Sequence, residues 1–189
     1  MLYTEEEIVK QYADEVKGQI AQGLRWQGLI GQPLCSRCPL RYDVKVYPDG
    51  PIPARMAFVG EGPGGYEVTN GVGLCGPTGQ LLWKLTSFYG YDRTNAWISN
   101  AALCRPRKVQ LSTGVTLPIE RVKWLSVQCC RPRLHAELEH VLRGVNGQRP
   151  VIVPLGNLAM KMITNRPLAR IMKYRGSIME YSPWKHPIK

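Results

Sequence analysis

Four of the six cysteines have a spacing that suits metal ligation. Cys35 and Cys38 form a Cys-x-x-Cys pair, which brings two thiolates to one centre from a tight turn. Cys104 and Cys130 would complete a set of four if the two halves of the chain fold together. Zinc and an iron–sulfur cluster both accept four thiolates, so spacing alone does not separate them. Ordinary buried cysteines are the alternative for Cys104, Cys129 and Cys130.

A glycine-rich loop carries the carboxylate that is best placed for chemistry. The run GEGPG at residues 60–64 directly follows an apolar stretch, and its glycines let backbone N–H groups approach a ligand closely. No Lys-Ser/Thr follows, and the spacing differs from the dinucleotide fingerprint, so a nucleotide cofactor is not favoured. Glu61 is expected to polarise a water molecule, the alternative being a solvated loop carboxylate. Cys75, further along the loop, is interpreted as a non-ligand.

The elements that must position these residues alternate between strands and helices. Apolar runs predict strands at residues 55–60, 96–100 and 151–156. Apolar periodicity predicts helices at residues 5–23, 80–89 and 119–142, with a further one capped by Asn157. This order predicts an α/β fold with a parallel sheet covered on both faces.

Finer features of these elements can also be read. Thr4 and Glu7 form a capping box at the start of the first helix. Residues 60–79 and 101–118 are expected to be long loops at the carboxyl ends of strands, where open α/β sheets bind ligands. The helix at 80–89 should bury Leu81, Leu82 and Leu85, and Pro132 is a candidate interruption of the helix at 119–142.

Composition bounds the class of protein. The chain has 189 residues, 44% of them apolar, and a formal charge of +11, which favours one folded domain over residues 1–189. We see no signal peptide and no apolar run of the ~18 residues that a membrane span needs, so a soluble, cytoplasmic protein is expected. The charge favours nucleic acid as partner. A merely soluble basic protein or a ribonucleoprotein subunit are the alternatives.

The chain resembles the family-4 uracil-DNA glycosylases, the iron–sulfur branch of the uracil-DNA glycosylase superfamily. The likeness spans about residues 35–176. Its ordered motifs are CSRCPL, DGPIPARMAFVGEGPG with the loop GEGPGGYEVTNGVGLCGPTGQLL, ISNAALCRP, CRPRL and PVIVPLGNLA. The resemblance implies a three-layer sandwich around a central parallel four-stranded sheet.

The resemblance also implies a set of site residues. Glu61 would orient or activate a water molecule, and the amide of Asn100 would read the edge of a uracil base. A [4Fe-4S] cluster would be held by four cysteines, with the CRPRL motif selecting Cys130 over Cys129; the ligands are Cys35, Cys38, Cys104 and Cys130, and zinc on the same cysteines is the alternative. The base and flanking phosphates would be held by Gly60, Gly62, Pro63, Gly64, Leu74, Gly76 and Gly79.

The implied activity is DNA repair by a glycosylase, which flips uracil out of DNA and hydrolyses its N-glycosidic bond to leave an abasic site. The cluster would be structural. The expected partners are uracil-containing DNA and a fused or separate replication or repair protein. The DNA phosphates would be contacted by Arg105, Arg107 and Lys108, with Arg131 and Arg133 beside them.

The sequence departs from the family pattern in three places, and the first and third of them favour an alternative function. Gly73-Leu74 replaces a Pro-Phe pair whose ring stacks on the base, a loss of roughly 1–3 kcal/mol. The segment between Cys104 and Cys130 is longer than usual, and the extra residues are expected to reach DNA or a partner. The closing His-Pro-Ser loop is not evident, and His186-Pro187 lacks the preceding strand. The alternative is a catalytically impaired glycosylase-like domain that binds nucleic acid or serves assembly, or part of a longer polypeptide. His135 and His140 are expected at the surface or beside the cluster.

Overall fold

The computed structural model describes residues 4–143, 149–179 and 181. Its main sheet has the strand order β1-β2-β4-β3-β7, and the strands are β1 (Trp26–Gln27), β2 (Asp49–Gly50), β3 (Met56–Gly60), β4 (Ala96–Asn100) and β7 (Val151–Pro154). β3 pairs in parallel with both β4 and β7, whereas β1 and β2 are antiparallel additions. The α/β class and the parallel core are confirmed. The sheet is mixed, with five strands where four parallel ones were expected.

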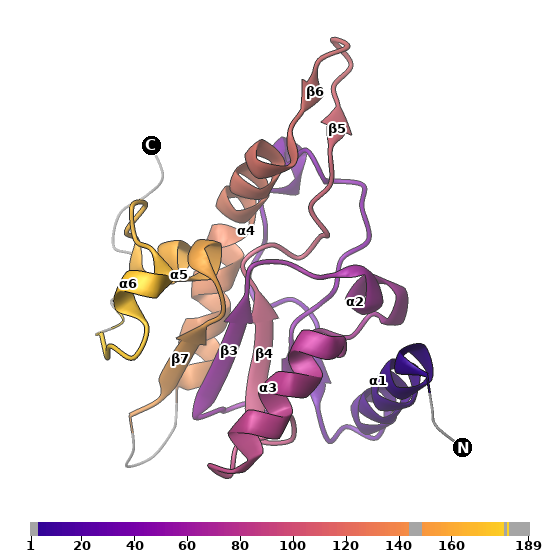
Figure 1. The fold of residues 1–189 in the computed structure, drawn as a ribbon, viewed down its shortest axis with the longest axis vertical. Coiled ribbons are helices and arrows are strands. Elements are labelled where there is room, and N and C mark those ends of the chain that lie inside the picture. Colours follow the sequence, from indigo (N-terminus) through magenta and orange to yellow (C-terminus); the bar gives the residue numbers. More distant parts are fainter. Residues whose placement is uncertain (1–3, 144–148, 180, 182–189) are drawn as a thin grey trace.

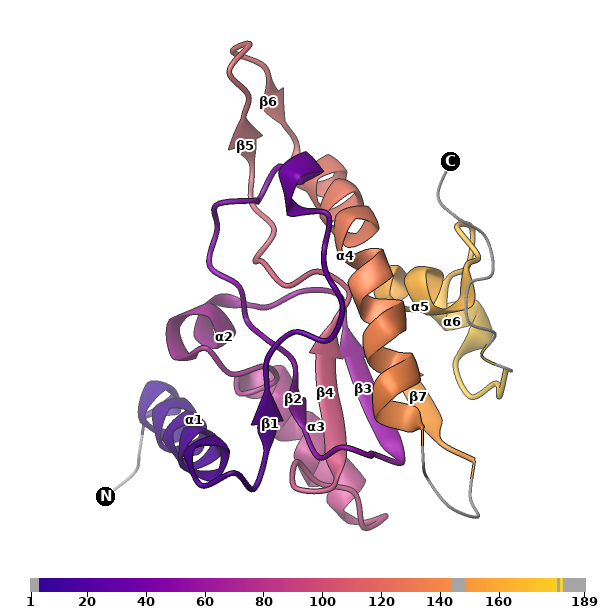
Figure 2. The same ribbon diagram turned by 180° about the vertical axis from the view of Figure 1, so that it is seen from behind.

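Helices cover both faces of this sheet, which confirms the three layers (Figures 1 and 2). The helices are α1 (Glu5–Ala21), α2 (Gly65–Asn70), α3 (Pro77–Ser87), α4 (Ile119–Leu142), α5 (Asn157–Thr164) and α6 (Ile171–Tyr174). α3 lies on one face, and α4 and α5 lie on the other. None of the helices in the described ranges is long and apolar enough to cross a membrane.

Each face of the sheet has its own core. On the α4 side, Val59, Trp97, Leu134 and Leu138 belong to one buried cluster. On the α3 side, Phe58, Trp83 and Ile98 belong to another. Successive residues of β3 and β4 therefore serve opposite layers, as the alternation of side chains along a strand requires. This is why both strands are near-continuous apolar runs in the sequence.

The structure corrects several local expectations. The predicted loop at residues 60–79 contains α2, and the loop at 101–118 contains a hairpin of β5 (Val109–Gln110) and β6 (Thr116–Leu117). α3 begins at Pro77 and buries Gly79 and Trp83, so Leu81 and Leu85 are exposed. The expected leucine face is therefore wrong for Leu81 and Leu85, whereas Leu82 is half-buried and packs against the same core as Trp83.

Three expectations about the caps and the continuity of the helices can be compared with the structure. The capping box of Thr4 and Glu7 is confirmed. Asn157 does not cap α5, because Gly156 occupies the N-cap position and the Asn157 side chain accepts from the Ile171 N–H at 2.7 Å instead. α4 continues through Pro132 without a break, with buried residues on both sides of it.

Candidate functional site

The carboxyl ends of β3 and β4 bring Gly60 and Asn100 side by side as a register pair. The residue Asn100 is 5% exposed. A Cβ atom added to Gly60 would lie 2.3 Å from Asn100 Oδ1, and one added to Gly73 would lie 4.0 Å from Asn100 Nδ2. The amide therefore lies between two glycine segments, the first at residues 60–64 and the second at residues 73–79. It fits there only because residue 60 has no side chain.

A buried ionic group fixes the backbone of Asn100. Arg133 Nη2 donates to the Asn100 carbonyl at 2.7 Å, and its Nη1 donates to Ser99 Oγ at 3.0 Å and to Glu137 at 2.5 Å. Glu137 also accepts from the Trp97 indole N–H at 2.8 Å. Arg133 and Glu137 are both fully buried, so a buried ion pair joins α4 to the carboxyl end of β4. Removing either partner would leave the other charge buried without a counter-charge, which destabilises the fold strongly.

The basic residues expected to contact DNA phosphates differ in their exposure and in the partners they already have. Arg131 and Arg133 are buried, so these two expected phosphate contacts are wrong: both side chains serve the interior of the fold. Arg107 is exposed but forms a two-pronged contact with Asp43, at 2.8 and 2.7 Å. Arg105 and Lys108 are exposed, so these two can meet phosphates.

Glu61 faces away from Asn100. Its Oε1 accepts from the Leu158 N–H at 3.0 Å, at the start of α5, and no hydrogen bond from the described residues reaches its Oε2. Because consecutive residues point to opposite faces of a strand, Gly60 shares a face with Asn100, and Glu61 is directed to the α5 side. The two expected catalytic residues lie at the same end of the sheet but on different sides of it.

Glu61 lines a cavity of about 300 Å³. The other lining residues are Gly62, Pro63, Arg105, Pro106, Ile119, Lys123, Val127 and Leu158. The structure thus brings together the expected residues Glu61, Gly62, Pro63 and Arg105. Asn100 and the second glycine segment lie outside this lining.

Glu67 joins the two glycine segments, a role that the sequence analysis missed. Its Oε2 accepts from the Gly64 N–H and its Oε1 from the Gly76 N–H, both at 3.0 Å. These two N–H groups were expected to face a base or phosphate, and the carboxylate occupies them instead. Glu67 lies three residues after the N-cap Gly64, but glycine has no side chain to complete a capping box, so the sequence carried no specific signal for this role.

Replacing Glu67 with glutamine should lower the free energy of unfolding by roughly 1.5–3 kcal/mol, because the charged acceptor of two backbone N–H groups is lost and one N–H meets an amide NH₂ group. Urea unfolding of the two proteins measures this difference. Glu15→Gln, at an exposed position of α1, is the matched control and should change stability little. Equal midpoints for the Glu67 and Glu15 variants would show that the carboxylate does not hold the segments together.

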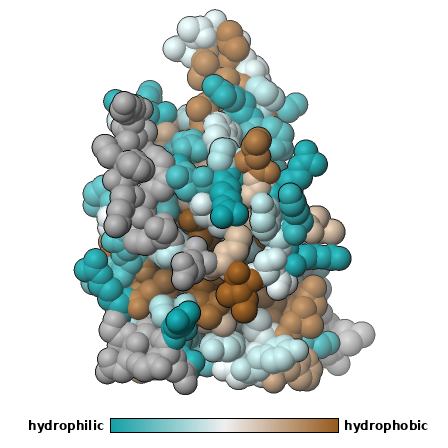
Figure 3. All heavy atoms as spheres, turned by 90° about the vertical axis from the view of Figure 1, so that its left-hand side faces the viewer, coloured by the Kyte–Doolittle hydropathy of each residue, from teal (hydrophilic) through white to brown (hydrophobic). Residues whose placement is uncertain are grey.

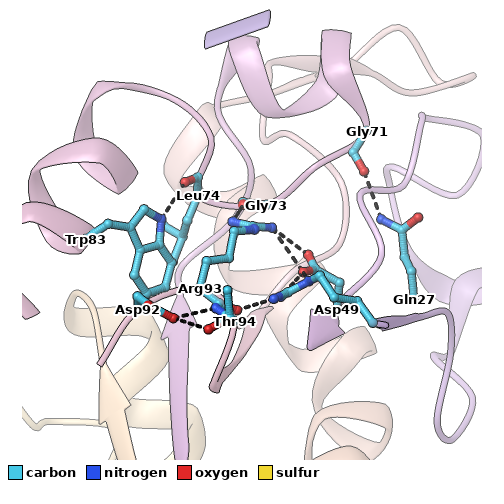
Figure 4. Close-up of polar contacts among 10 residues, drawn as sticks. Gln27, Asp49, Gly71, Gly73, Leu74, Trp83, Asp92, Arg93 and Thr94 are labelled. Carbon is cyan, nitrogen blue, oxygen red and sulfur yellow. Dashed lines mark hydrogen bonds and ion pairs between the residues drawn. The ribbon is translucent and has the colours of Figure 1, made fainter. Parts of the chain in front are cut away.

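Leu74 lies in the core and not at a pocket wall. It is buried with Phe58, Trp83 and Ile98, and its carbonyl accepts from the Trp83 indole N–H at 3.2 Å (Figure 4). A Cβ atom on Gly79 would lie 1.9 Å from the Leu74 carbonyl oxygen. Gly79 is therefore required for packing, and the expectation that Leu74 and Gly79 face the base is not met.

A buried charge triad supports the second glycine segment (Figure 4). Arg93 donates to the Gly73 carbonyl at 2.6 Å and to Asp49 Oδ2 at 2.8 Å. Arg25 donates to the other Asp49 oxygen and to the Arg93 carbonyl. Asp49 is fully buried between the two arginines, so the triad fixes the segment opposite Asn100.

The cysteines gather at the end of the sheet near the β5–β6 hairpin. Cys38, Cys104 and Cys129 belong to one buried cluster. The Leu34 N–H, next to Cys35, donates to the Cys129 carbonyl at 2.8 Å. Burial raises the pKa of the Cys38 thiol to about 12 and that of Cys104 to about 11, and the nearby Cys130 thiol adds to both shifts. Cys75 lies apart, beside α1.

These thiols lie in one region, but they are not arranged as the ligands of a single metal ion. In the described ranges, no three His, Cys, Asp or Glu side chains converge closely enough to hold a single metal ion. Thiols this deeply buried would ionise only beside a cation, which deprotonates a thiol that coordinates it. Soft thiolate ligands suit zinc and iron–sulfur clusters alike, so the donor chemistry of the gathered thiols fits either group. The buried cluster contains Cys129, whereas the resemblance selects Cys130 as the ligand.

His135 is buried, so of its two expected positions, at the surface or beside the cluster, the surface is wrong; His140 is exposed. The His135 Nδ1 atom lies 2.9 Å from the Tyr181 hydroxyl. Burial, followed by the charge of Arg131, lowers the pKa of His135 below its usual value of 6.5. His186-Pro187 lies outside the described residues.

His135 should make stability depend on pH. The unfolded chain takes up a proton near pH 6.5, whereas the folded chain does so only at lower pH, so the stabilisation is full above pH 6.5 and is lost as pH falls through the folded pKa. Denaturant unfolding between pH 7.5 and pH 5 should show a smaller loss for His135→Gln than for the wild type. His140→Gln should follow the wild type. Parallel curves for all three proteins would contradict this assignment.

Comparisons with known proteins agree on one family. A sequence profile described as the Uracil DNA glycosylase superfamily matches residues 47–188. A type-4 uracil-DNA glycosylase of Thermotoga maritima is 28% identical over 182 residues, which cover 95% of this chain and 78% of the relative. A type-4 uracil-DNA glycosylase of Archaeoglobus fulgidus is 30% identical over 161 residues, which cover 82% and 72% of the two chains.

Proposed function

Because the chain belongs to the uracil DNA glycosylase superfamily, we propose that it extrudes uracil from DNA and hydrolyses the N-glycosidic bond to leave an abasic site. The observation that carries this proposal is the buried amide of Asn100, seated between Gly60 and Gly73 at the carboxyl end of the sheet. The relatives that cover most of the chain are type-4 uracil-DNA glycosylases.

Asn100 would read the base. Its amide offers one acceptor and an NH₂ donor, which match the N–H and carbonyl on the edge of uracil. The side chain itself has no hydrogen bond to another described residue, so its polar atoms are free for a ligand. When the glycosidic bond breaks, negative charge develops on the departing uracil, and a preorganised donor in a dry site stabilises that charge.

Glu61 would act on the other side of the scissile bond. Its Oε1 is held by the Leu158 N–H, which leaves Oε2 able to orient a water molecule in the adjoining cavity. The sugar becomes positively charged as the bond breaks, and a nearby carboxylate favours that charge. A deoxyribose lying across the end of the β3–β4 pair would meet the amide on one side and the carboxylate on the other.

The test is abasic-site formation in a duplex oligonucleotide that contains one uracil. After incubation with the protein, hot alkali should cleave the strand at the uracil position, because alkali breaks DNA at abasic sites. The same oligonucleotide with thymine should remain intact. Absence of cleavage by folded protein that binds the DNA would contradict the proposal.

Cys35, Cys38, Cys104 and Cys130 would hold a [4Fe-4S] cluster. The cluster would supply structural cross-linking, because it would join the segment around η1 (Cys35–Arg37) to the end of β4 and to α4. No step of the hydrolysis needs a metal: Asn100 binds the base and Glu61 orients water. Arg105 and Lys108 would contact the phosphates.

The purified protein should be brown and contain iron. Changing Cys104 to serine should remove the colour and most of the iron, since one of four ligands is lost. Cys75→Ser is the control, and it should retain iron because Cys75 lies in a separate cluster beside α1. Iron and zinc analysis with a visible spectrum measures the effect. A colourless protein with one bound zinc per chain would exclude the cluster.

A second function is favoured by Leu74. Where the family pattern has a stacking ring, Leu74 is buried in the core, so this position offers no aromatic platform for a flipped base, which fits a domain that binds nucleic acid without catalysis. DNA binding that weakens steeply with salt, together with intact uracil-containing strands, would support this second function. Abasic sites would exclude it.

A further inference from the structure

Lys123 is the one amine among the described residues that line the cavity beside Glu61. It lies between Ile119 and Val127, which line the same cavity. These three residues of α4 are four positions apart, and residues at this spacing form one stripe along a helix. The first two turns of α4 therefore supply one wall of the cavity, and the loop that carries Glu61 supplies another.

A weak ion pair holds the end of the Lys123 side chain. Its Nζ atom lies 2.9 Å from Glu120 Oε1, and the Glu120 side chain is 77% exposed, against 32% for that of Lys123. Exposed ion pairs contribute at most about 1 kcal/mol. The amine can therefore leave Glu120 for a ligand in the cavity at little cost.

Two other groups border the same space. Glu61 has one carboxylate oxygen held by the Leu158 N–H, and its Oε2 has no hydrogen-bond partner among the described residues. Arg105 also lines the cavity and is exposed. A guanidinium stays charged and binds phosphate, but it offers no free electron pair to a carbon atom. Lys123 is therefore the nucleophile of this group, Glu61 the proton acceptor and Arg105 the phosphate contact.

The surface on this side suits a polyanion. Figure 3 looks onto the side that carries α5 and α6, and below the hydrophobic apex its upper half is mostly hydrophilic. Residues 149–179, which include β7, α5 and α6, contain six Lys and Arg side chains and no Asp or Glu. Since phosphates bind to such a surface whatever the base sequence, DNA can stay beside the cavity after the base has left.

We propose that Lys123 cuts the DNA strand at the abasic site that the glycosylase reaction leaves. The opened sugar of that site carries an aldehyde at C1′. The amine of Lys123 adds to this carbon and a water molecule leaves, which gives an imine. The proposal rests on the proposed function, which places the C1′ atom at Glu61, and it adds a lyase activity to that site.

The strand then breaks by β-elimination. Glu61 takes the C2′ proton, the electrons of that C–H bond form a C2′–C3′ double bond, and the C3′–O bond breaks. Its electron pair leaves with the oxygen, so the released strand ends in a 5′-phosphate. Water hydrolyses the imine and restores Lys123, and Glu61 returns its proton to solvent. The sequence of steps needs no oxidant or reductant.

Sodium borohydride tests the imine directly, because it reduces an imine to a stable amine and so joins the protein to DNA. A labelled duplex with a pre-formed abasic site makes the test independent of uracil release. The wild type should give a cross-linked band on a denaturing gel. Lys123→Arg keeps the charge but has no amine nucleophile, so its cross-linked yield should fall by about tenfold or more. Strand cleavage without borohydride should fall in parallel.

Lys17→Arg is the matched control. Lys17 is also a lysine of a helix with an ion-pair partner three residues away, Asp14 at 3.8 Å, and it lies outside the cavity lining. This variant should cross-link and cleave like the wild type. A duplex with a tetrahydrofuran analogue, which has no aldehyde, should not cross-link to any of the proteins.

Three results would overturn the proposal. They are no cross-link to the folded wild type, an equal yield from Lys123→Arg, and a Lys123→Arg variant that no longer binds the tetrahydrofuran duplex, which would make Lys123 a phosphate contact. Thermal unfolding shows whether the variant is folded. A wild type that cross-links through Lys123 to the pre-formed abasic site but releases no uracil would refute the proposed function and leave the lyase reaction standing.

Discussion

Replacing Asn100 with alanine is expected to reduce uracil release by roughly 10²–10³-fold, the usual cost of losing one preorganised donor to developing charge. The fold should survive, because the amide side chain bonds no other described residue and the backbone of Asn100 is held separately by Arg133. Single-turnover release measures the chemical step, and thermal unfolding reports whether the fold is intact.

Two companion variants sharpen this result. Asn100→Asp keeps the size of the side chain but places a negative charge where the uracil anion forms, so it should be as inactive as Asn100→Ala. Gly60→Ala should also be impaired, because its Cβ would lie 2.3 Å from Asn100 Oδ1 and displace the amide. Gly18→Ala, where a Cβ meets nothing within 4 Å, is the control. Near-normal release by both Asn100 variants would show that the base binds elsewhere.

Replacing Asp49 with alanine should cause the largest loss of stability, about 3–5 kcal/mol, because it leaves Arg25 and Arg93 buried without a counter-charge. At about 2–4 °C per kcal/mol for a chain of this size, the melting temperature should fall by roughly 6–20 °C. Denaturant unfolding measures the free energy, and differential scanning calorimetry measures the melting temperature.

Asp43→Ala is the matched control for this variant. Asp43 pairs with the exposed Arg107 at 2.7 Å, and exposed pairs contribute at most about 1 kcal/mol. The Asp49 variant should therefore be several-fold more damaging than the Asp43 variant. Similar losses for the two would mean that the triad is not a buried charge group on which the fold depends.

The parallel core was predictable because its signals are local. β3 and β4 are short apolar runs buried on both faces, and α4 carries apolar residues at helical spacing along its whole length. The start of α1 was readable because the capping box lies within four consecutive residues. In each case, the residues that specify the element are neighbours in the chain.

The missed features depend on residues that are far apart in the chain. β1 and β2 are two residues long, too short for any periodicity to show. The Asp49 triad joins residues separated by 24 and 44 positions, and nothing near Asp49 in sequence indicates its partners. Arg133 looks like a surface cation until the pairing with Glu137 and the carbonyl of Asn100 is seen.

The candidate site was predictable in its parts but not in its arrangement. The glycine loop, Asn100 and the cysteines were identified from motif and spacing. Their relative placement was not, because the direction of each side chain follows from strand alternation and from packing against other layers. The opposite orientations of Glu61 and Asn100 are one result, and the burial of Leu74 in the α3 core is another.

The central claim is that the base binds at the Asn100 amide between the two glycine segments. A crystal structure of the protein with free uracil, the product of the proposed reaction, tests it most directly. We expect the uracil edge within hydrogen-bond distance of Asn100 Oδ1 and Nδ2. Uracil bound in the cavity beside Lys123 and Glu61, with the Asn100 amide untouched, would contradict the account.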